Sequence, residues 1–295
     1  MNKLFDEYLE TLSTRLSILP DKQEETPLNT LRALWFSAAG VSVSAIKSEF
    51  YELPELSNDE YHQLRELIRK RLENVPLAHL TGKQSFLDMD FHAGPEALIP
   101  RKETELLALT AINILKDMDA QQVNVIDVCT GAGNVAIAIA HSIEKAMVFA
   151  SDISDGAIKL AKRNAKLHKL SSKVSFYCGD LLQPFDKMGL KSKVDLLCCN
   201  PPYISSSKVS EMPCEISGYE PGEAFDGGAF GVNLICRLIT DAEKYLRPKG
   251  YLAFEVGIGQ GAAMLKYFNK TGSYYGTRML NDGFGNPRVI VAQKI

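Results

Sequence analysis

From residue 123 to residue 292 the sequence alternates short runs rich in β-branched and aromatic residues with amphipathic stretches of helical period. Runs of the first kind are typical of strands, whereas apolar residues spaced three and four apart indicate helices. The alternation predicts a mainly parallel sheet with helices on both faces. The expected strands are residues 123–128, 146–150, 174–177, 194–199, 251–256 and 287–292, and the expected helices are residues 135–141, 155–168, 230–246 and 260–268.

The first 75 residues have a different, helical pattern and predict a small bundle. Helices are expected at residues 4–19, 27–39, 42–50 and 58–72, with Ser57 as the cap of the last one. Residues 86–91 alternate apolar and acidic side chains, which predicts a strand within a hairpin. A further helix is expected from about residue 100 to 117, with Glu103 and Glu105 in its first turn. The predicted organisation is a helical domain at 1–75, a hairpin linker at 76–97 and an α/β domain at 98–295.

Charge and cysteine usage exclude several classes of function. Lys and Arg total 33 against 36 for Asp and Glu, giving a net charge of −3 and no general basic field for nucleic acid. Six cysteines are too few for a disulfide scaffold, and Cys129, Cys198 and Cys199 lie in apolar runs. There is no CxxC or HExxH motif, so no metal site is expected. Without a signal peptide or an apolar run of about 20 residues, the sequence predicts a cytoplasmic protein without membrane association.

The segment Val125-Ile-Asp-Val-Cys-Thr-Gly-Ala-Gly133 has the pattern of a strand, a turn of small residues and a helix. Small residues let the backbone approach a ligand, and the helix start offers amide donors. Asp152 ends the next strand, where a carboxylate can bind ribose hydroxyls. The alternatives are a tight strand–helix connection and a helix cap at Asp152. The turn is shorter than GxGxxG, which favours S-adenosylmethionine (SAM) over a nicotinamide cofactor.

Two further strand ends have polar residues. Cys178-Gly-Asp180 follows the third expected strand, and Asp180 could accept hydrogen bonds from an adenine amino group or serve as a turn residue. Asn200-Pro-Pro-Tyr203 follows a buried run. The Asn200 amide oxygen and the Pro201 carbonyl are acceptors that suit an NH₂ group awaiting alkylation, and Tyr203 offers a flat stacking face.

Together these motifs resemble class I SAM-dependent methyltransferases that act on planar NH₂ groups. Two branches of that class share Asn-Pro-Pro-Tyr: the DNA adenine methyltransferases and the glutamine methyltransferases of peptide-chain release factors, the PrmC/HemK family. More of the chain is similar to the second branch. The matching segments are Val75-Pro-Leu-Ala-His-Leu-Thr-Gly82, Leu98-Ile-Pro-Arg-Lys-Glu-Thr-Glu105 and Glu220-Pro-Gly-Glu-Ala-Phe-Asp-Gly-Gly228.

The resemblance implies a Rossmann-like α/β fold with a mainly parallel seven-stranded sheet, SAM as cofactor and a release factor as protein substrate. It implies methyl transfer to a glutamine side-chain nitrogen. The expected cofactor-binding residues are Asp127, Cys129, Thr130, Gly131, Ala132, Gly133, Asp152, Asp180, Leu181 and Asn200. The expected catalytic residues are Asn200, Pro201 and Tyr203, and the expected substrate-binding residues are Asn200, Pro201, Pro202, Tyr203, Arg101 and Glu220.

Some positions depart from the family pattern and leave other substrates open. Gly222 and Asn286 stand where the family has charged residues, so a small-molecule amine or amide, or another alkyl-transfer reaction, is the main alternative. A non-catalytic SAM-binding module is a further one. DNA or RNA methylation is less expected, because no basic target-recognition domain is evident and bases would need flipping. The helical domain is expected to recognise the substrate, or else to cap the structure.

Overall fold

A computed structural model describes residues 3–228 and 231–295, and the chain forms two compact units. The first unit consists of the chain up to Pro95 together with Ile99–Lys102 and Pro213–Glu220. The second contains Glu96–Leu98, Glu103–Met212 and Pro221–Ile295. The hairpin region and one short segment from the last third of the chain therefore belong with the N-terminal helices.

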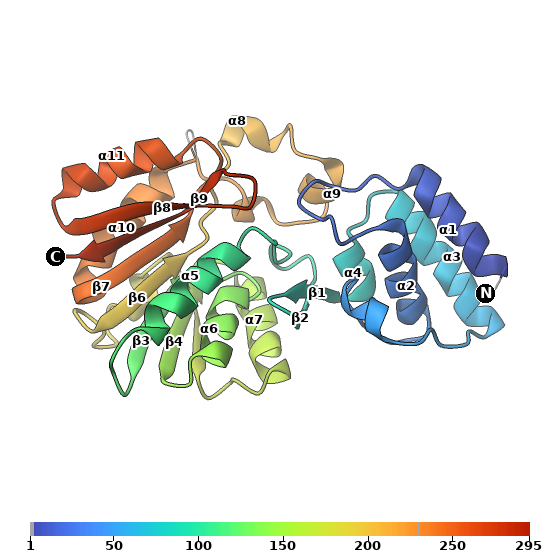
Figure 1. The fold of residues 1–295 in the computed structure, drawn as a ribbon, viewed down its shortest axis with the longest axis horizontal. Coiled ribbons are helices and arrows are strands. Elements are labelled where there is room, and N and C mark those ends of the chain that lie inside the picture. The colour runs from blue at the N-terminus through green and yellow to red at the C-terminus, as the bar shows by residue number, and fades with distance from the viewer. Residues whose placement is uncertain (1–2, 229–230) are drawn as a thin grey trace. The chain divides into compact units, whose positions relative to one another are not determined.

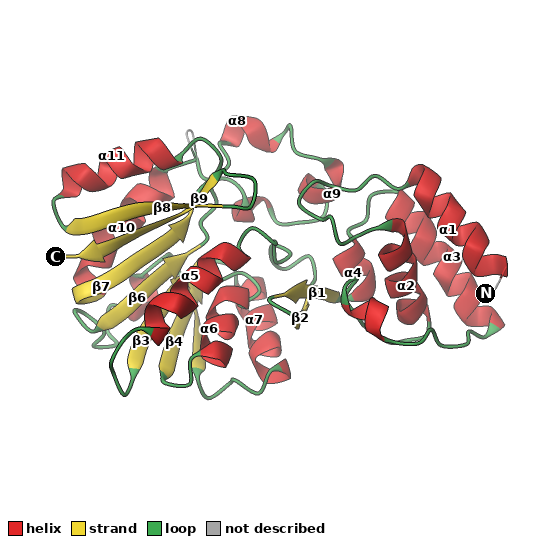
Figure 2. Ribbon diagram, in the orientation of Figure 1, coloured by secondary structure: helices red, strands yellow, loops and turns green. Residues whose placement is uncertain are grey.

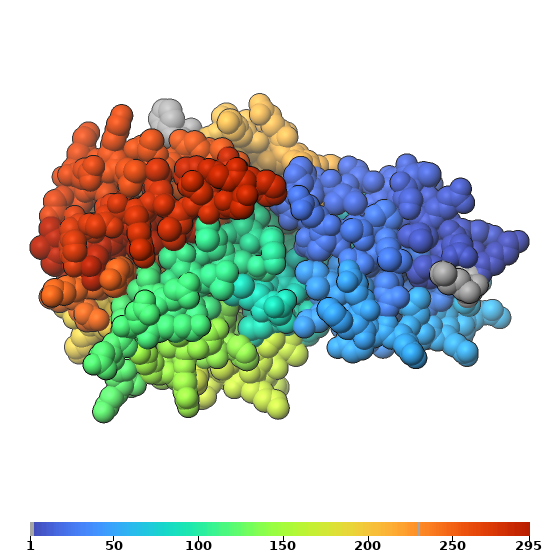
Figure 3. Space-filling model, in the orientation of Figure 1, coloured from blue at the N-terminus to red at the C-terminus, as the bar shows by residue number. Residues whose placement is uncertain are grey.

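The first unit contains the predicted bundle, built from α1 (Lys3–Arg15), α2 (Pro27–Ala38), α3 (Asn58–Leu72) and the short α4 (Leu77–Thr81). Ser57 caps α3 as expected: its hydroxyl accepts from the Glu60 amide, and the Glu60 carboxylate accepts from the Ser57 amide at 2.6 Å. The side chains of α1 to α3 form one hydrophobic core, in which Leu12, Leu31 and Leu34 are fully buried. Figure 3 shows the surface of these N-terminal residues in blue.

Two of the expected helices in this unit are shorter than the sequence pattern indicates. The first ends at Arg15 rather than at residue 19. Pro20 disfavours helical geometry only at Leu19, the residue directly before it. The helix expected at residues 42–50 is reduced to the 3₁₀ turn η1 (Lys47–Phe50).

The alternating segment at residues 86–91 is a hairpin turn and not one strand. Strands β1 (Lys83–Phe86) and β2 (Met89–His92) pair antiparallel around Leu87 and Asp88, which both have positive φ. The prediction of a hairpin is confirmed, but the expected strand is wrong because apolar alternation continues across a two-residue turn. The rings of Phe86 and Phe91 meet edge to face at 6.1 Å, and both are fully buried.

The second unit has a seven-stranded sheet, which confirms the predicted α/β class (Figures 1 and 2). The strand order is β5-β4-β3-β6-β7-β9-β8; β3 to β7 run parallel, and β9 is antiparallel to both β7 and β8. The strands are β3 (Val123–Val128), β4 (Ala146–Asp152), β5 (Val174–Cys178), β6 (Val194–Cys199), β7 (Leu246–Glu255), β8 (Tyr274–Asn281) and β9 (Pro287–Lys294).

The sheet has helices on both faces (Figure 2). Helices α5 (Glu105–Lys116), α6 (Asn134–Ser142) and α7 (Asp155–Leu167) cover one face, and α10 (Asn233–Tyr245) and α11 (Gly261–Thr271) cover the other. Helix α5 begins at Glu105 and not near residue 100. The expected helix from residue 230 begins at Asn233, and residue 230 itself lies outside the described residues. The short elements are η2 (Gln183–Phe185), α8 (Ser206–Val209), α9 (Cys214–Ser217) and η3 (Gly222–Ala224).

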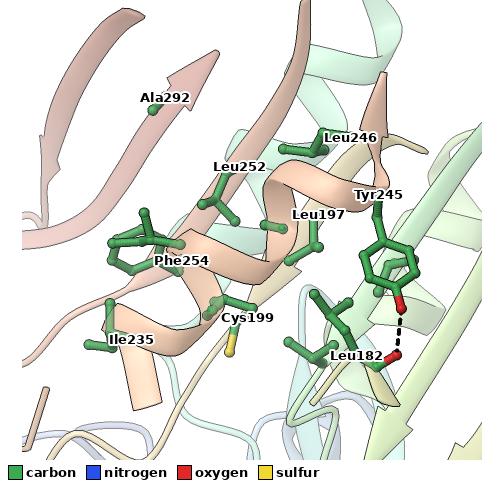
Figure 4. Close-up of a cluster of buried hydrophobic side chains, with 14 of the residues drawn as sticks. Leu182, Leu197, Cys199, Ile235, Tyr245, Leu246, Leu252, Phe254 and Ala292 are labelled. Atoms are coloured by element: carbon green, nitrogen blue, oxygen red, sulfur yellow. Dashed lines mark hydrogen bonds between the residues drawn. The ribbon is translucent and has the colours of Figure 1, made fainter. Parts of the chain in front are cut away.

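A hydrophobic core between α10 and the sheet holds strands β6 and β7 in place (Figure 4). Leu197 and Cys199 from β6 and Leu252 and Phe254 from β7 are fully buried there. The Tyr245 hydroxyl donates to the Leu182 carbonyl at 3.2 Å. This packing gives the residues that follow β6 and β7 a rigid base.

Among the helices of the described ranges 3–228 and 231–295, none has both the length and the apolar character that a membrane crossing requires. The six cysteines are free. Of the three in apolar runs, Cys198 and Cys199 are buried and Cys129 is half-buried.

Candidate functional site at the strand ends

The strand order of the second unit reverses at β3, so the chain has a topological switch point at the carboxyl ends of the central strands. From β3 the chain proceeds to β4 and β5 on one side, then returns to place β6 on the other side of β3. In open α/β sheets ligands bind outside the carboxyl ends of the strands at such a switch point. The motifs singled out in the sequence follow β3, β4, β5 and β6, so the topology brings them to one edge of the sheet.

The turn after β3 has the strained backbone that small residues permit. Cys129, Gly131 and Gly133 have φ values of 57°, 53° and 82°. A Cβ on Gly133 would lie 3.0 Å from the Ala161 side chain, so only glycine fits this close approach. Ala132 is buried against α7, where its carbonyl accepts from Asn164 Nδ2 at 2.9 Å. The turn therefore presents backbone with little side-chain cover.

Asp127 is engaged in holding this turn together. Its carboxylate accepts from the Thr130 hydroxyl at 2.6 Å, and the residue is 1% exposed. Burial raises the pKa of Asp127 to about 7, against the opposing effect of hydrogen bonds from Thr130 and the Ala136 amide. The structure thus places Asp127 beneath the turn rather than at its open side.

Asp152 joins the ends of β3 and β4. One carboxylate oxygen accepts from the Gly131 amide at 2.8 Å and the other from the Ser154 amide at 3.0 Å. Burial raises its pKa, and the backbone hydrogen bonds work in the opposite direction. Each carboxylate oxygen retains further acceptor capacity, which is what a ribose hydroxyl needs.

The two residues expected to bind the cofactor after β5, Asp180 and Leu181, differ in exposure. Asp180 is partly exposed and pairs with Arg237 at 2.7 Å. Leu181 is buried in the core, and its carbonyl accepts from the Ser151 hydroxyl at 2.6 Å. Of Asp180 and Leu181, only the Asp180 side chain is therefore accessible to a ligand.

The segment Asn200-Pro-Pro-Tyr203 leaves the fully buried strand β6 and is held by three side-chain hydrogen bonds. Asn200 Nδ2 donates to the Thr104 hydroxyl oxygen at 3.0 Å. The Tyr203 hydroxyl donates to Glu255 Oε1 at 3.1 Å, and Gln260 Nε2 donates to the Tyr203 carbonyl at 2.8 Å. Since the Asn200 nitrogen is engaged, its Oδ1 is the atom oriented to accept.

Sequence reasoning missed three residues beside this segment. Glu255 ends β7 and is fully buried, and Thr104 precedes α5 at 2% exposure. Arg288 contacts the carboxylates of Glu103 at 3.3 Å and Asp282 at 3.7 Å. An acid at the end of an apolar strand, as at Glu255, is the signal that could have drawn attention to this cluster.

Arg101 and Glu220, both expected to bind substrate, lie in the first unit and pair with each other. Arg101 Nη2 contacts Glu220 Oε1 at 2.5 Å, and Glu220 Oε2 accepts from the Ile99 amide at 2.8 Å. Arg101 is 8% and Glu220 5% exposed. Their role in substrate binding stays a prediction.

Of the two departures from the family pattern, only Asn286 has a local explanation in the structure. A Cβ on Gly222 would meet nothing within 4 Å, so the glycine is not required by packing. Asn286 closes the connection between β8 and β9, where its amide donates to Asp282 Oδ1 at 2.9 Å. Arg288, two residues later, provides a positive charge beside Tyr203 and Glu255.

Comparison with known proteins identifies the family. Residues 119–275 match the family model described as a methyltransferase domain. The release factor glutamine methyltransferase of Thermodesulfovibrio yellowstonii is 33% identical over 83% of this chain and 86% of its own length. That of Rhodopirellula baltica is 33% identical over 92% of this chain and 91% of its own. A structure of human methyltransferase 10 domain containing protein has a TM-score of 0.52 at 18% identity, covering 70% of this chain and 88% of that one, and supports the fold. The chain is a methyltransferase and belongs to the release factor glutamine methyltransferase family.

Proposed function

We propose that this protein transfers a methyl group from SAM to the side-chain nitrogen of a glutamine in a peptide-chain release factor. The observation that carries the proposal is Asn200, which lies at the switch point with its amide nitrogen bound to Thr104. Its amide oxygen has no hydrogen-bond partner among residues 3–228 and 231–295 and can accept from a substrate. The names of relatives that match more than four-fifths of the chain support the same substrate.

The residues at the ends of β3 and β4 suit the nucleoside part of SAM. Asp152 has acceptor capacity for ribose hydroxyls, and the positive-φ turn at Gly131 and Gly133 leaves the backbone uncovered. Asp180 could accept from the adenine amino group once it turns from Arg237. We assign Asp127 the role of holding the turn and not that of a direct cofactor contact.

The chain itself would orient the nucleophile. When bound, SAM supplies a methyl group on a positively charged sulfur. An amide nitrogen is a weak nucleophile because its lone pair is delocalised, so holding it in line with the methyl group is the main contribution. Asn200 Oδ1 and the Pro201 carbonyl would accept from the two N–H bonds and stabilise positive charge that develops on nitrogen. Tyr203 would stack on the planar amide, with Pro202 fixing its backbone.

The test is methyl transfer from labelled SAM to a purified release factor, with mass spectrometry to locate the modified residue. One methyl group on one glutamine is the expected result, and replacing that glutamine by asparagine should abolish labelling. Asn281→Ala, an exposed asparagine of β8, is the matched control for Asn200→Ala. Labelling of a metabolite in a cell extract, with none of the release factor, would overturn the substrate and favour the small-molecule reaction.

We further propose that the helical unit docks the release factor. It has an open groove with apolar and aromatic lining, formed by Phe5, Leu28, Arg32, Trp35, Leu53, Pro54, Glu55, Leu56 and Tyr61. Leu28 is 45% exposed there, and Leu109 on α5 of the other unit is 44% exposed. Leu28→Glu should raise KM for the release factor severalfold without changing SAM affinity, whereas Leu109→Glu should not. Equal KM values for the two variants would contradict the docking role.

A further inference from the structure

One buried carboxylate lies behind both polar side chains of the Asn200–Tyr203 segment. Glu255 is 0% exposed and accepts from the Tyr203 hydroxyl at 3.1 Å. Burial raises its pKa, while hydrogen bonding from the Thr104 hydroxyl works in the opposite direction. Glu255 Oε2 has no partner at strict hydrogen-bond geometry within residues 3–228 and 231–295. Thr104 in turn accepts from Asn200 Nδ2 at 3.0 Å.

The chemistry of these groups fixes the direction of every proton in the chain. An ionised carboxylate only accepts, so both neighbouring hydroxyls must donate to it. A threonine hydroxyl has one proton, and once that proton points at Glu255 the oxygen can only accept from Asn200. The side of the Asn200 amide that faces Thr104 must therefore be the nitrogen, which turns Oδ1 toward the open side of the site.

We propose that Thr104 and Glu255 are positioning residues that set the orientation of the Asn200 amide, and that Glu255 also holds the Tyr203 ring in place. The proposal deepens the function given above and rests on Asn200 Oδ1 being the acceptor for the substrate NH₂. An amide rotated by half a turn would present two donors to that NH₂ group, which is itself a donor. Orientation of this one side chain thus decides whether the site attracts or repels its substrate.

We call the hydrogen-bonded series Glu255, Thr104 and Asn200 the relay. The charges around Glu255 determine the pH range in which its carboxylate is ionised and the relay is formed. Glu103 raises its pKa further, and Arg288 and the Tyr203 hydroxyl lower it, with a net value of about 7. A protonated Glu255 can donate to Thr104, which frees the threonine proton to face Asn200 and removes the bias on the amide. We therefore expect kcat to fall as pH decreases through about 7.

The kinetic test compares Thr104→Val and Thr104→Ser with a control, Thr110→Val, at another buried threonine. Thr104→Val removes the hydroxyl at nearly constant volume and should lower kcat about 10- to 100-fold, with KM and SAM affinity within about twofold of wild type. Thr104→Ser should restore most of the loss. Thr110→Val is the control, because Thr110 is also buried and its hydroxyl donates to the Leu106 carbonyl of its own helix.

Glu255→Gln provides the second variant. It should lower kcat to a similar extent and flatten the acid limb of the pH profile. Because both residues act through Asn200, the double variant should be little worse than the more damaged single variant. The relay is refuted if the fold decrease in kcat of the double variant equals the product of the two single decreases. It is also refuted if Thr110→Val lowers kcat as much as Thr104→Val does.

A measurement without substrate separates this inference from the proposed function. The side-chain amide protons of Asn200, assigned by their disappearance in Asn200→Asp, should include one protected from exchange in the wild type at pH 8. That protection should vanish in Thr104→Val and return in Thr104→Ser. An unprotected amide in the wild type refutes the relay even if methylation occurs. Protection with no methylation of any release factor supports the relay and refutes the proposed substrate.

Discussion

Replacing Glu215 by alanine is expected to destabilise the helical unit by about 3–5 kcal/mol. Glu215 is 3% exposed, and its carboxylate contacts Lys22 Nζ at 2.6 Å and Arg71 Nη1 at 2.9 Å. Arg71 also contacts Glu25 at 2.7 Å, so two buried cations face two buried carboxylates. Removing Glu215 leaves a net positive charge in the interior, and breaking a buried pair on one side costs about 3–5 kcal/mol.

The pKa values show that Glu215 is the firmly ionised acid of this group. Burial raises the pKa of Glu25, and Lys22 and Arg71 offset only part of that effect. Burial acts on Glu215 in the same direction, but Lys22 and Arg71 together outweigh it, so the pKa of Glu215 lies below its ordinary value. Its loss therefore removes a full negative charge.

Tryptophan fluorescence during urea unfolding measures the loss of stability of the helical unit itself. Trp35 is the single tryptophan and is buried in the helical core, so its emission follows that unit. With an m-value of about 1–2 kcal/mol/M, the midpoint should fall by at least about 1.5 M. The exposed Glu211→Ala should change the unfolding free energy by less than about 0.5 kcal/mol.

A double variant tests the charge argument itself. Adding Lys22→Met to Glu215→Ala leaves Arg71 facing Glu25, which restores charge balance. At least about 1 kcal/mol of the lost stability should return. The reasoning is refuted if Glu215→Ala unfolds at the midpoint of Glu211→Ala, or if the double variant is no more stable than Glu215→Ala.

Three further outcomes follow from the second unit. Asp152→Ala should weaken SAM binding by about 1–3 kcal/mol in calorimetry, and the exposed Asp155→Ala should leave it unchanged. Asn200→Ala should lower kcat by roughly 10²–10³ with a smaller effect on SAM affinity, so near-normal turnover would contradict its role. Burial raises the pKa of Glu255 from 4.5 to about 7, so its contribution to stability is complete below about pH 4.5 and is lost as pH rises to 7. The stability of Glu255→Gln relative to wild type, measured by urea unfolding, should therefore increase by about 2–3 kcal/mol between pH 5 and pH 8. Asp127 titrates equally in both proteins and does not affect this difference. A difference that stays constant with pH would show that Glu255 is not the titrating group.

The sequence predicted the sheet because its signals are local. Strands β3 to β6 are apolar runs that begin and end at turn residues, and parallel pairing then places Asp152 and Asn200 at one edge. Strand β8 was not predicted, since it is an edge strand with a single buried residue, Tyr274, and an irregular register at Gly276. The hairpin turn at Leu87 was missed because apolar alternation does not reveal positive φ.

The interactions behind the site could not be read from the sequence. Asn200 and Thr104 are 96 positions apart, and Lys22 and Glu215 are 193 apart. Charged and polar residues at such separations have no spacing rule that indicates pairing. The family resemblance identified Arg101 and Glu220 as substrate-binding residues, which stays a prediction, but it gave no sign that the two pair with each other.

The make-up of the helical unit also determines when it can be completed on the ribosome. Its core is encoded before Pro95, yet Glu215, which balances the charge of Lys22 and Arg71, belongs to Pro213–Glu220. That segment is made about 120 residues after Lys102, which at about 5–20 residues per second is a delay of roughly 6–24 s. A nascent chain in this interval has the helices but an uncompensated buried cation. The N-terminal unit is therefore expected to mature late, and a ribosome stalled before Pro213 should display it in a protease-sensitive form.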